Sequence, residues 1–393
     1  MMRALLLLIL PMLQGIIARN QSKPSSTIAN DTFDFAASSP ESIRIKRVID
    51  RVQDCIKHNP YYRDGSIYHF PDDAEEHYRD ILNTTVIFRQ IVMHTWSDYS
   101  GPWIENFYIK NFVDKPLSFF NGLIPLFIQW TDLHCSEWIE PKNVSAPTRE
   151  TLRNALKKVL RKDVLYVTVD QDDQGIFEPL ANEFPNILSL SAGGFGHIPI
   201  PLIKGELPYH DPPNSTSEYQ WTVGFFGTRD RHGRATMLQQ LEHSFRQNHI
   251  TYHFGKSANW KVNILKSKFN LAPRGFGRTS FRLAEIVQSG RVPVYLYDDY
   301  EWLPYQGTFE GFDKYGLVGH INDAQKTMNM IKNMGDDQYN KLIEHIKRIR
   351  HLYTYNGAIE QIKLFLTDPF GDGGGYLRCS ANQPKKDHRL RRA

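Results

Sequence analysis

The sequence has only three cysteines, Cys55, Cys135 and Cys379, and no two of them have the spacing of a CxxC pair. This scarcity excludes a disulfide-rich scaffold and a cysteine-based zinc site. Because the number is odd, at most one disulfide bond can form within the chain. We expect the remaining thiol to be buried rather than catalytic.

Long apolar runs are also scarce, and the clearest spans Ala4 to Ala18 after Arg3. It is shorter than the roughly 20 residues that a membrane-spanning helix needs. We therefore interpret residues 1–18 as a secretory signal peptide, with a membrane-retained signal anchor as the alternative. Both place the protein in the secretory pathway, in the Golgi or ER lumen or outside the cell. Five Asn-x-Ser/Thr sequons agree with this, at Asn20, Asn30, Asn83, Asn143 and Asn214.

A large excess of charge of one sign is absent, because 47 basic residues face 43 acidic ones, a net charge of +4. The segment Lys385–Arg392 alone carries five Lys or Arg residues against one Asp, so the rest of the chain is balanced. A general nucleic-acid-binding surface is therefore not expected. The basic tail is predicted to be solvated and disordered.

The length of 393 residues is enough for two α/β domains. Residues 19–39 are rich in Ser, Thr, Asn and Asp without periodicity, which predicts a flexible lumenal stem. The polar, Pro-containing cluster at 211–218 predicts a boundary between an N-terminal domain (40–212) and a C-terminal domain (219–368). A Gly-rich and basic tail (369–393) follows.

Apolar runs that predict strands alternate with segments that have helical periodicity. In the first half, Leu123–Trp130, Val164–Val169 and Ile187–Leu190 are predicted strands, and Trp103–Phe112 and Thr148–Leu160 are predicted helices. Such alternation is typical of a doubly wound parallel sheet. We therefore predict an α/β fold with two Rossmann-like doubly wound domains.

The most informative segment consists of two short apolar runs, Phe269–Ala272 and Val292–Tyr297, which predict strands of a parallel sheet. Between them lie a loop and a helix that Thr279 or Ser280 can cap. Gly290 occupies the position where a left-handed residue ends a helix. The segment therefore predicts a β-α-β unit.

The loop before this helix contains Gly275 and Gly277 together with Arg274 and Arg278. A helix that begins after such a loop presents free N–H groups and the positive end of its dipole to an anion. Arg282 lies in the first turn, where a basic side chain is unfavourable unless an anion compensates it. The pattern predicts a phosphate site, although any β-α-β unit shares part of it.

This segment resembles the donor-binding half of exostosin-type glycosyltransferases. In that family a strand ending in x-P-x-G is followed by a Ser-x-Arg-x-x-Glu helix and a Gly-x-x-Pro-Val strand. The matching residues here are Pro273, Gly275, Ser280, Arg282, Glu285, Gly290, Pro293 and Val294. Two more segments are similar: Trp221–Arg234 to the family's strand and basic turn, and Asp298–Tyr305 to its acidic-aromatic loop.

The resemblance implies a GT-B-like transferase, in which two domains face across a cleft and the C-terminal helix crosses back to the first domain. It implies inverting transfer from a UDP-sugar, the co-substrate, to a glycan or glycoprotein acceptor. It implies no other cofactor and no metal, because basic side chains take the place of a metal in such folds. The resemblance is compatible with a homo-oligomer or a hetero-oligomer. The alternatives are a fucosyl-type GDP-sugar transferase and a catalytically silent lumenal lectin or partner subunit.

The predicted nucleotide-sugar-binding residues combine positive charge with the helix N-terminus, and they are Arg229, Arg234, Gly275, Arg278, Ser280, Arg282 and Glu285. Arg234, then Arg229, is preferred for the diphosphate, and the alternative is a solvated basic loop. By the resemblance, Glu285 accepts hydrogen bonds from the ribose hydroxyls. The alternative for Glu285 is an ion pair with Arg278 or Arg282.

The candidates for the catalytic base are Asp172 and Asp173, which lie in an acidic turn after a predicted strand, and Asp98. The acidic turn also permits a metal, because hard cations take oxygen ligands. The resemblance argues against that interpretation. The Gly-rich loop within Ser191–Lys204 is predicted to shape the acceptor side of the cleft.

Overall fold

The computed structural model describes residues 39–57, 67–91, 95–96, 99–139, 147–229, 233–306, 311–369 and 377–379. Residues from Pro40 onward form one compact unit, distinct from residues 1–39. The predicted signal segment, most of the stem and most of the basic tail lie outside the described residues. Within the described ranges, no helix has both the length and the apolar character to cross a membrane.

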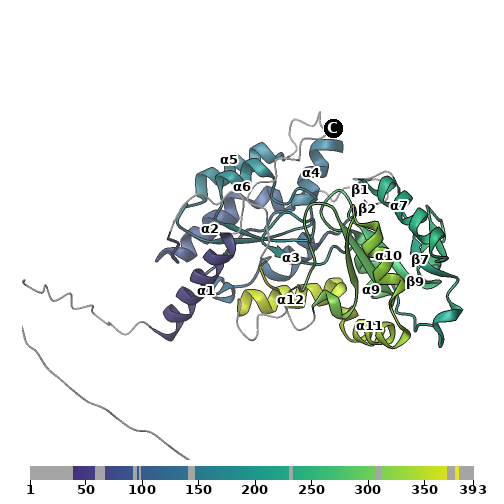
Figure 1. Cartoon of the computed structure of the whole chain (residues 1–393). Helices are drawn as coiled ribbons and strands as arrows, with labels where there is room; N and C mark the ends of the chain where they lie inside the picture. Colours follow the sequence, from purple (N-terminus) through teal and green to yellow (C-terminus); the bar gives the residue numbers. More distant parts are fainter. Residues whose placement is uncertain are drawn as a thin grey trace, which may run out of the picture. The chain divides into compact units, whose positions relative to one another are not determined.

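The described strands form two parallel sheets and one short antiparallel pair (Figure 1). The N-terminal sheet has the order β3-β4-β5-β6, with β3 Ile124–Pro125, β4 Tyr166–Asp170, β5 Ile187–Ser191 and β6 Ile198–Pro199. The C-terminal sheet has the order β11-β10-β9-β7-β8, with β11 Leu317–His320, β10 Val292–Tyr297, β9 Ser267–Pro273, β7 Trp221–Phe225 and β8 Tyr252–Phe254. The antiparallel pair is β1 Thr95–Trp96 and β2 Tyr99–Ser100. The predicted α/β class with parallel sheets is confirmed.

The described part of the chain contains twelve α-helices. Those that come before β7 in the chain are α1 Pro40–Ile56, α2 Ala74–Thr84, α3 Ile104–Phe112, α4 Trp130–Ile139, α5 Arg149–Val159 and α6 Glu178–Glu183. Those after β7 are α7 Arg234–Gln247, α8 Trp260–Leu265, α9 Phe281–Gln288, α10 Ala324–Lys332, α11 Asp336–Ile349 and α12 Tyr355–Thr367. Short 3-10 helices lie at Val86–Arg89, Leu117–Phe120, Thr216–Glu218, Phe312–Lys314 and Arg350–Tyr353.

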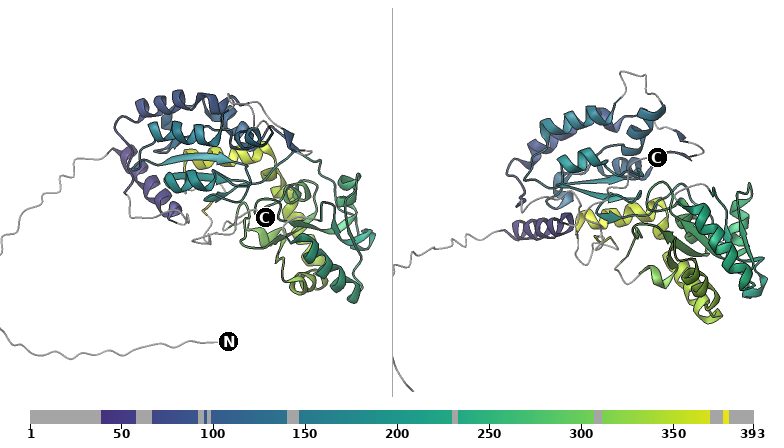
Figure 2. Two further views of the ribbon diagram at one scale, coloured as in Figure 1. Left: turned by 90° about the horizontal axis from the view of Figure 1, so that it is seen from above. Right: turned by 45° about the horizontal axis from the view of Figure 1, so that its top comes forward.

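The central strands of the N-terminal sheet are covered on both faces. Every residue of β4 and β5 is buried, and helices lie on both sides of this sheet (Figure 2). The sequence of these strands is mostly apolar, and even their polar residues are buried, because a parallel sheet leaves neither face to water.

One predicted strand, Leu123–Trp130, is wrong over most of its length. Only Ile124–Pro125 pairs as β3, and α4 begins at Trp130. Between them the chain leaves the sheet, and the Gln129 N–H donates to the Phe88 carbonyl at 3.0 Å. The run is buried throughout. A continuous apolar run of this length indicates burial, but its periodicity does not distinguish a strand from a helix.

The last helix, α12, packs against elements of the N-terminal half, as the resemblance implies. It contacts α3, where the ring of Tyr355 stacks on Phe107 with centroids 4.3 Å apart. At the other end of α12, Asn121 Nδ2 donates to the Leu366 carbonyl at 3.2 Å and also to that of Thr367. Asn121 has φ +47°, a left-handed conformation that asparagine tolerates better than most residues.

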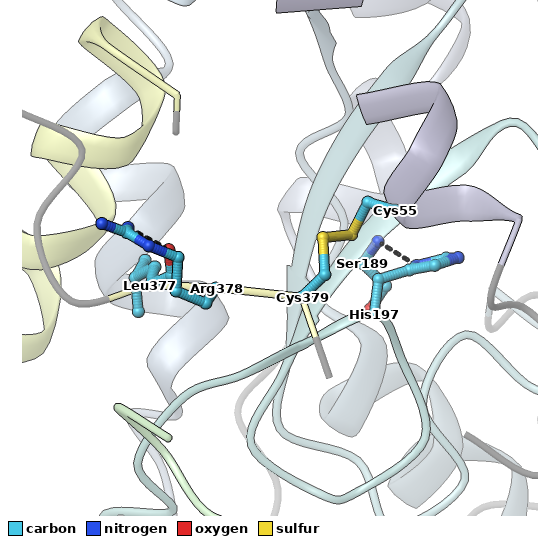
Figure 3. The surroundings of a disulfide bond; sticks show 6 residues. All are labelled: Cys55, Ser189, His197, Leu377, Arg378 and Cys379. Atoms are coloured by element: carbon cyan, nitrogen blue, oxygen red, sulfur yellow. Dashed lines mark hydrogen bonds between the residues drawn. A yellow bond between two sulfur atoms is a disulfide. The ribbon is translucent and has the colours of Figure 1, made fainter. Parts of the chain in front are cut away.

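A single disulfide bond joins Cys55, in the last turn of α1, to Cys379, with 5.6 Å between the Cα atoms (Figure 3). The two cysteines are 324 residues apart. Cys135 is a buried free thiol, and its burial raises its pKa to about 12. It therefore stays protonated and inert at neutral pH, which confirms the expectation that the remaining thiol is buried.

Candidate functional site

The C-terminal sheet has a topological switch point between β7 and β9. From β7 the chain passes to β8 on one side and then returns to β9 on the other side of β7. In open parallel sheets, ligands bind outside the carboxyl ends of the two strands that flank such a point. The predicted phosphate loop follows β9 directly, so it lies at this switch point.

Arg234, the first residue of α7, links the two strand ends at the switch point. It is 9% exposed. Its guanidinium donates to the carbonyl of Thr228, after β7, at 3.1 Å. It also donates to the carbonyls of Pro273 at 3.0 Å and Arg274 at 2.8 Å, at the end of β9. In this structure Arg234 therefore links the loop after β7 to the end of β9.

The helix start after the loop has the predicted cap. Ser280 has an extended backbone, and its hydroxyl accepts from the Arg282 N–H at 3.3 Å. The loop before it closes on itself, because the Gly275 N–H donates to the Thr279 carbonyl at 2.6 Å. Gly290, with φ +78°, follows the helix end as predicted. The first turn of α9 therefore lies in the position that a phosphate-binding helix requires.

Arg282, which is partly exposed, and Glu285, which is buried, form a pair on the first turns of α9. Arg282 Nη1 lies 2.8 Å from Glu285 Oε2, and Nη2 donates to the Phe226 carbonyl after β7 at 2.7 Å. The guanidinium also stacks over the Trp260 ring at 4.0 Å. Burial raises the pKa of Glu285, although the charge of Arg282 opposes the change. The ion pair named as the alternative role of Glu285 is thus present in this structure.

Two further arginines of the loop are held by the acidic-aromatic segment. Arg278 Nε lies 3.1 Å from Asp299, and Arg274 lies 3.0 Å from Asp299 and also contacts Asp298. Burial would raise the pKa of Asp299, but Arg278 and Arg274 hold it below its usual range. The positive charge predicted for the loop is therefore present, and part of it is compensated by these carboxylates.

Arg229 differs from the other predicted donor residues. It forms an ion pair with Glu242 of α7 at 2.9 Å, and the two side chains are 35% and 20% exposed. The structure gathers the other predicted residues around the start of α9 or at the β7 and β9 ends. These are Arg234, Gly275, Arg278, Ser280, Arg282 and Glu285.

The loops at the carboxyl ends of both sheets meet at this site. The Arg278 N–H donates to the Gly193 carbonyl at 2.9 Å, and Arg278 Nη1 donates to the Gly194 carbonyl at 3.1 Å. Trp302 Nε1 donates to the Ser191 carbonyl at 3.0 Å. The Gly-rich loop after β5 therefore lies directly against the predicted phosphate loop.

This contact depends on Gly277, and we expect Gly277→Ala to lower the free energy of unfolding by about 3 kcal/mol, near the upper end for overpacking. A Cβ at this position would lie 1.9 Å from the Gly193 carbonyl oxygen, a backbone atom that cannot rotate away. Chemical denaturation measures the change. Gly255→Ala is the matched control, because no atom lies within 4 Å of its added Cβ. Equal stability of the two variants would contradict the contact.

The acidic turn after β4 brings Asp172 to a histidine. His134 Nδ1 lies 2.6 Å from Asp172 Oδ2 and 3.9 Å from Asp173 Oδ1. The other oxygen of Asp172 accepts the Gln174 N–H at 2.8 Å. The third predicted base, Asp98, lies outside the described residues. Sequence reasoning missed His134 because it lies in α4, a helix that follows a buried run and carries no motif.

The side-chain ligand atoms of His134, Asp172 and Asp173 lie within 4.8 Å of one another, close enough for a cation. Arg149 lines the same small cavity, which has a volume of about 10 Å³ and room for about one water molecule. The guanidinium of Arg149 is itself paired with Glu137 at 2.6 Å. A larger hollow of about 540 Å³, between α7 and α10, contains none of the predicted site residues in its lining.

No protein-family model matches the chain. Two solved structures have some similarity to it. One is a point mutant of TarM from S. aureus in complex with fondaparinux, α-GlcNAc-glycerol and UDP, with 12% identity and a TM-score of 0.35 over 57% of this chain and 54% of that one. The other is TarM itself, with 13% identity and a TM-score of 0.33 over 56% and 53%. The match thus spans about half of each neighbour, and similarity at this level identifies no function.

Proposed function

We propose that this protein is an inverting, exostosin-type glycosyltransferase that transfers a sugar from a UDP-sugar to a hydroxyl group of a glycan or glycoprotein. One observation carries the proposal. The motif residues Gly275, Ser280, Arg282 and Glu285 surround the start of α9, and the loop before α9 follows β9, one of the two strands that flank the switch point. A diphosphate placed there would meet backbone N–H groups, the positive end of the helix dipole and basic side chains.

The chemistry of sugar transfer explains this set of residues. The acceptor oxygen attacks the anomeric carbon, the bond from that carbon to the diphosphate breaks, and its electron pair leaves with the UDP. The N–H groups at the start of α9 and the guanidinium of Arg282 would stabilise the charge that develops on the diphosphate. The carboxylate of Glu285 would accept hydrogen bonds from the ribose hydroxyls. Its ion pair with Arg282 would weaken as these bonds form.

We also propose that the protein works in the lumen of the secretory pathway, either secreted or held by an N-terminal anchor. The Cys55–Cys379 disulfide fits an oxidising compartment. Of the predicted glycosylation sites, Asn83 and Asn214 fall among the described residues, and both side chains are exposed. Glycosylation requires such exposure.

Nucleotide binding tests the proposal. We expect UDP, but not GDP, to raise the melting temperature, because a ligand that binds only the folded state at 100 times its Kd adds about 2.7 kcal/mol. Glu285→Gln should weaken UDP binding about tenfold or more, the cost of losing hydrogen bonds to a charged group. Glu360→Gln is the control, since Glu360 is exposed on α12 and pairs with Lys363 one turn away.

Other results would point to the alternatives. Protection by GDP alone would replace the donor assignment with a fucosyl-type one. If neither nucleotide binds, the transferase proposal fails and the lectin or partner-subunit alternative takes its place.

A further inference from the structure

The His134–Asp172 pair is fixed more rigidly than an ordinary ion pair. The two side chains are 14% and 7% exposed, with 2.6 Å between Nδ1 and Oδ2. Both oxygens of Asp172 have partners, since the second one accepts the backbone N–H of Gln174. The carboxylate therefore cannot turn away from the imidazole without breaking the turn after β4.

This pairing determines which ring nitrogen can accept a proton. A carboxylate only accepts hydrogen bonds, so Nδ1 of His134 is the donor to Asp172. In the neutral imidazole the lone pair then lies on Nε2. An Asp that holds a His in this tautomer is the device that hydrolases use to orient a general base.

The pair lies next to the predicted phosphate loop. A Cβ at Gly277 would approach the Cα of Asp173 to 3.4 Å, and one at Gly193 would approach it to 3.1 Å. The residue after Asp172 is therefore in contact range of both loops that meet at the site. The His134–Asp172 pair therefore lies one residue away from a direct contact with the loop before α9.

We propose that His134 is the catalytic base of the sugar transfer and that Asp172 is its positioning residue. The inference rests on the proposed glycosyltransferase function. His134 Nε2 takes the proton of the acceptor hydroxyl as the acceptor oxygen forms its bond to the anomeric carbon. The bond between that carbon and the diphosphate breaks, and UDP leaves with the electron pair. The proton passes to solvent from the imidazolium after product release.

Asp173 is the rival base at the same place. Its side chain is 36% exposed, and it lies 3.9 Å from His134 Nδ1. A half-exposed carboxylate can accept a proton, and Asp173 lies beside His134, so it could act on the same acceptor hydroxyl. Separate variants of His134 and Asp173 therefore distinguish the two assignments.

The groups that face His134 from the surrounding elements determine its expected titration. Burial and the charge of Arg149 on α5 lower the pKa of His134. The hydrogen bond to Asp172 and the charges of Asp172 and Asp173 raise it. The second group of effects is larger, so the pKa of His134 lies above its usual value. A base must be neutral to work, so activity rises as pH passes this pKa. Replacing Asp172 by Asn removes the charge, and the acidic limb of the rate profile should move to lower pH.

The experiment measures UDP release from a panel of UDP-sugars (glucose, galactose, xylose, GlcNAc and glucuronic acid), together with UDP binding by calorimetry and melting temperature. We expect His134→Gln to lower kcat by about 10² to 10⁴, the usual contribution of a general base, with UDP affinity unchanged within about twofold. Asp172→Asn should lower kcat and shift the acidic limb downward. The matched controls are His69→Gln and Asp163→Asn, which disrupt an exposed His–Asp pair 3.6 Å apart and should change neither quantity.

Three results would overturn the assignment. The first is a His134→Gln variant that keeps wild-type kcat, and the second is a loss of kcat in Asp173→Asn alone. The third is wild-type activity that a chelator abolishes and a divalent cation restores, since the cluster would then hold a metal. If the wild-type protein binds no UDP, the transferase proposal itself fails, and the assignment of His134 as its base fails for the same reason. UDP binding without His134-dependent turnover removes the base and leaves the donor site in place.

Discussion

Replacing Arg234 by methionine is expected to lower the free energy of unfolding by about 3 to 5 kcal/mol and to abolish nucleotide binding. The guanidinium donates to the carbonyls of Thr228, Pro273 and Arg274, which belong to both strand ends at the switch point. Each buried carbonyl that loses its partner costs about 1 to 3 kcal/mol. Methionine preserves much of the volume, so the loss comes from the hydrogen bonds rather than from a cavity.

Two comparisons separate this role from a direct contact with the diphosphate. Arg229→Met removes a basic residue from the same turn, but its pair with Glu242 is partly exposed, so stability should change by less than about 1 kcal/mol. Arg234→Lys keeps the charge but loses the planar guanidinium that reaches two strand ends. This variant should therefore be nearly as unstable as Arg234→Met. Denaturant titration and UDP calorimetry measure both effects. A methionine variant with wild-type stability that still loses UDP binding would show that Arg234 contacts the nucleotide directly.

The local structure around the start of α9, where we propose the sugar donor to bind, could be predicted because its signals are local. The Ser280 cap, the apolar runs of β9 and β10 and the left-handed Gly290 each depend on a few neighbouring residues, and the structure has them where the sequence indicates. Cap and turn chemistry of this kind is readable along the chain, because the partners are at most a few positions away.

The partners of charged side chains could not be predicted, because they come from distant parts of the chain. Arg234 is 39 positions from Pro273, one of its acceptors, and Arg278 is 84 positions from Gly194. The sequence indicates that basic residues lie near the switch point. It does not show that the guanidinium of Arg234 donates its hydrogen bonds to backbone carbonyls. The same limit hides His134, whose partner Asp172 lies 38 positions further on.

The error at α4 has a related cause. Residues 123–130 are uniformly buried, and uniform burial removes the alternation that distinguishes a strand from a helix. A run without alternation therefore does not indicate that α4 starts at Trp130, nor that His134 lies on a helix.

Replacing Cys55 or Cys379 by serine is expected to lower the free energy of unfolding by about 4 to 5 kcal/mol, the upper range for a disulfide. The bond closes a loop of 324 positions, and in the chain-entropy model the stabilisation grows with loop length. It fixes the end of α1 to the segment 377–379, which follows α12, the helix that packs on α3 and is held at its end by Asn121. Loss of the bond should therefore also loosen the docking of α12.

Denaturation with and without a reducing agent tests this, because reductant should destabilise the wild-type protein to the level of Cys55→Ser and leave that variant unchanged. Cys135→Ala is the control, since its thiol is free and its variant should respond to reductant as the wild type does. The double variant Cys55→Ser/Cys379→Ser should be no less stable than either single one, because both remove the same interaction. Additive losses, or serine variants as stable as the wild type, would contradict a bond between these two residues. A protein purified from a reducing cytosol should then behave like the serine variants, which links the stability of the fold to the lumenal compartment proposed for it.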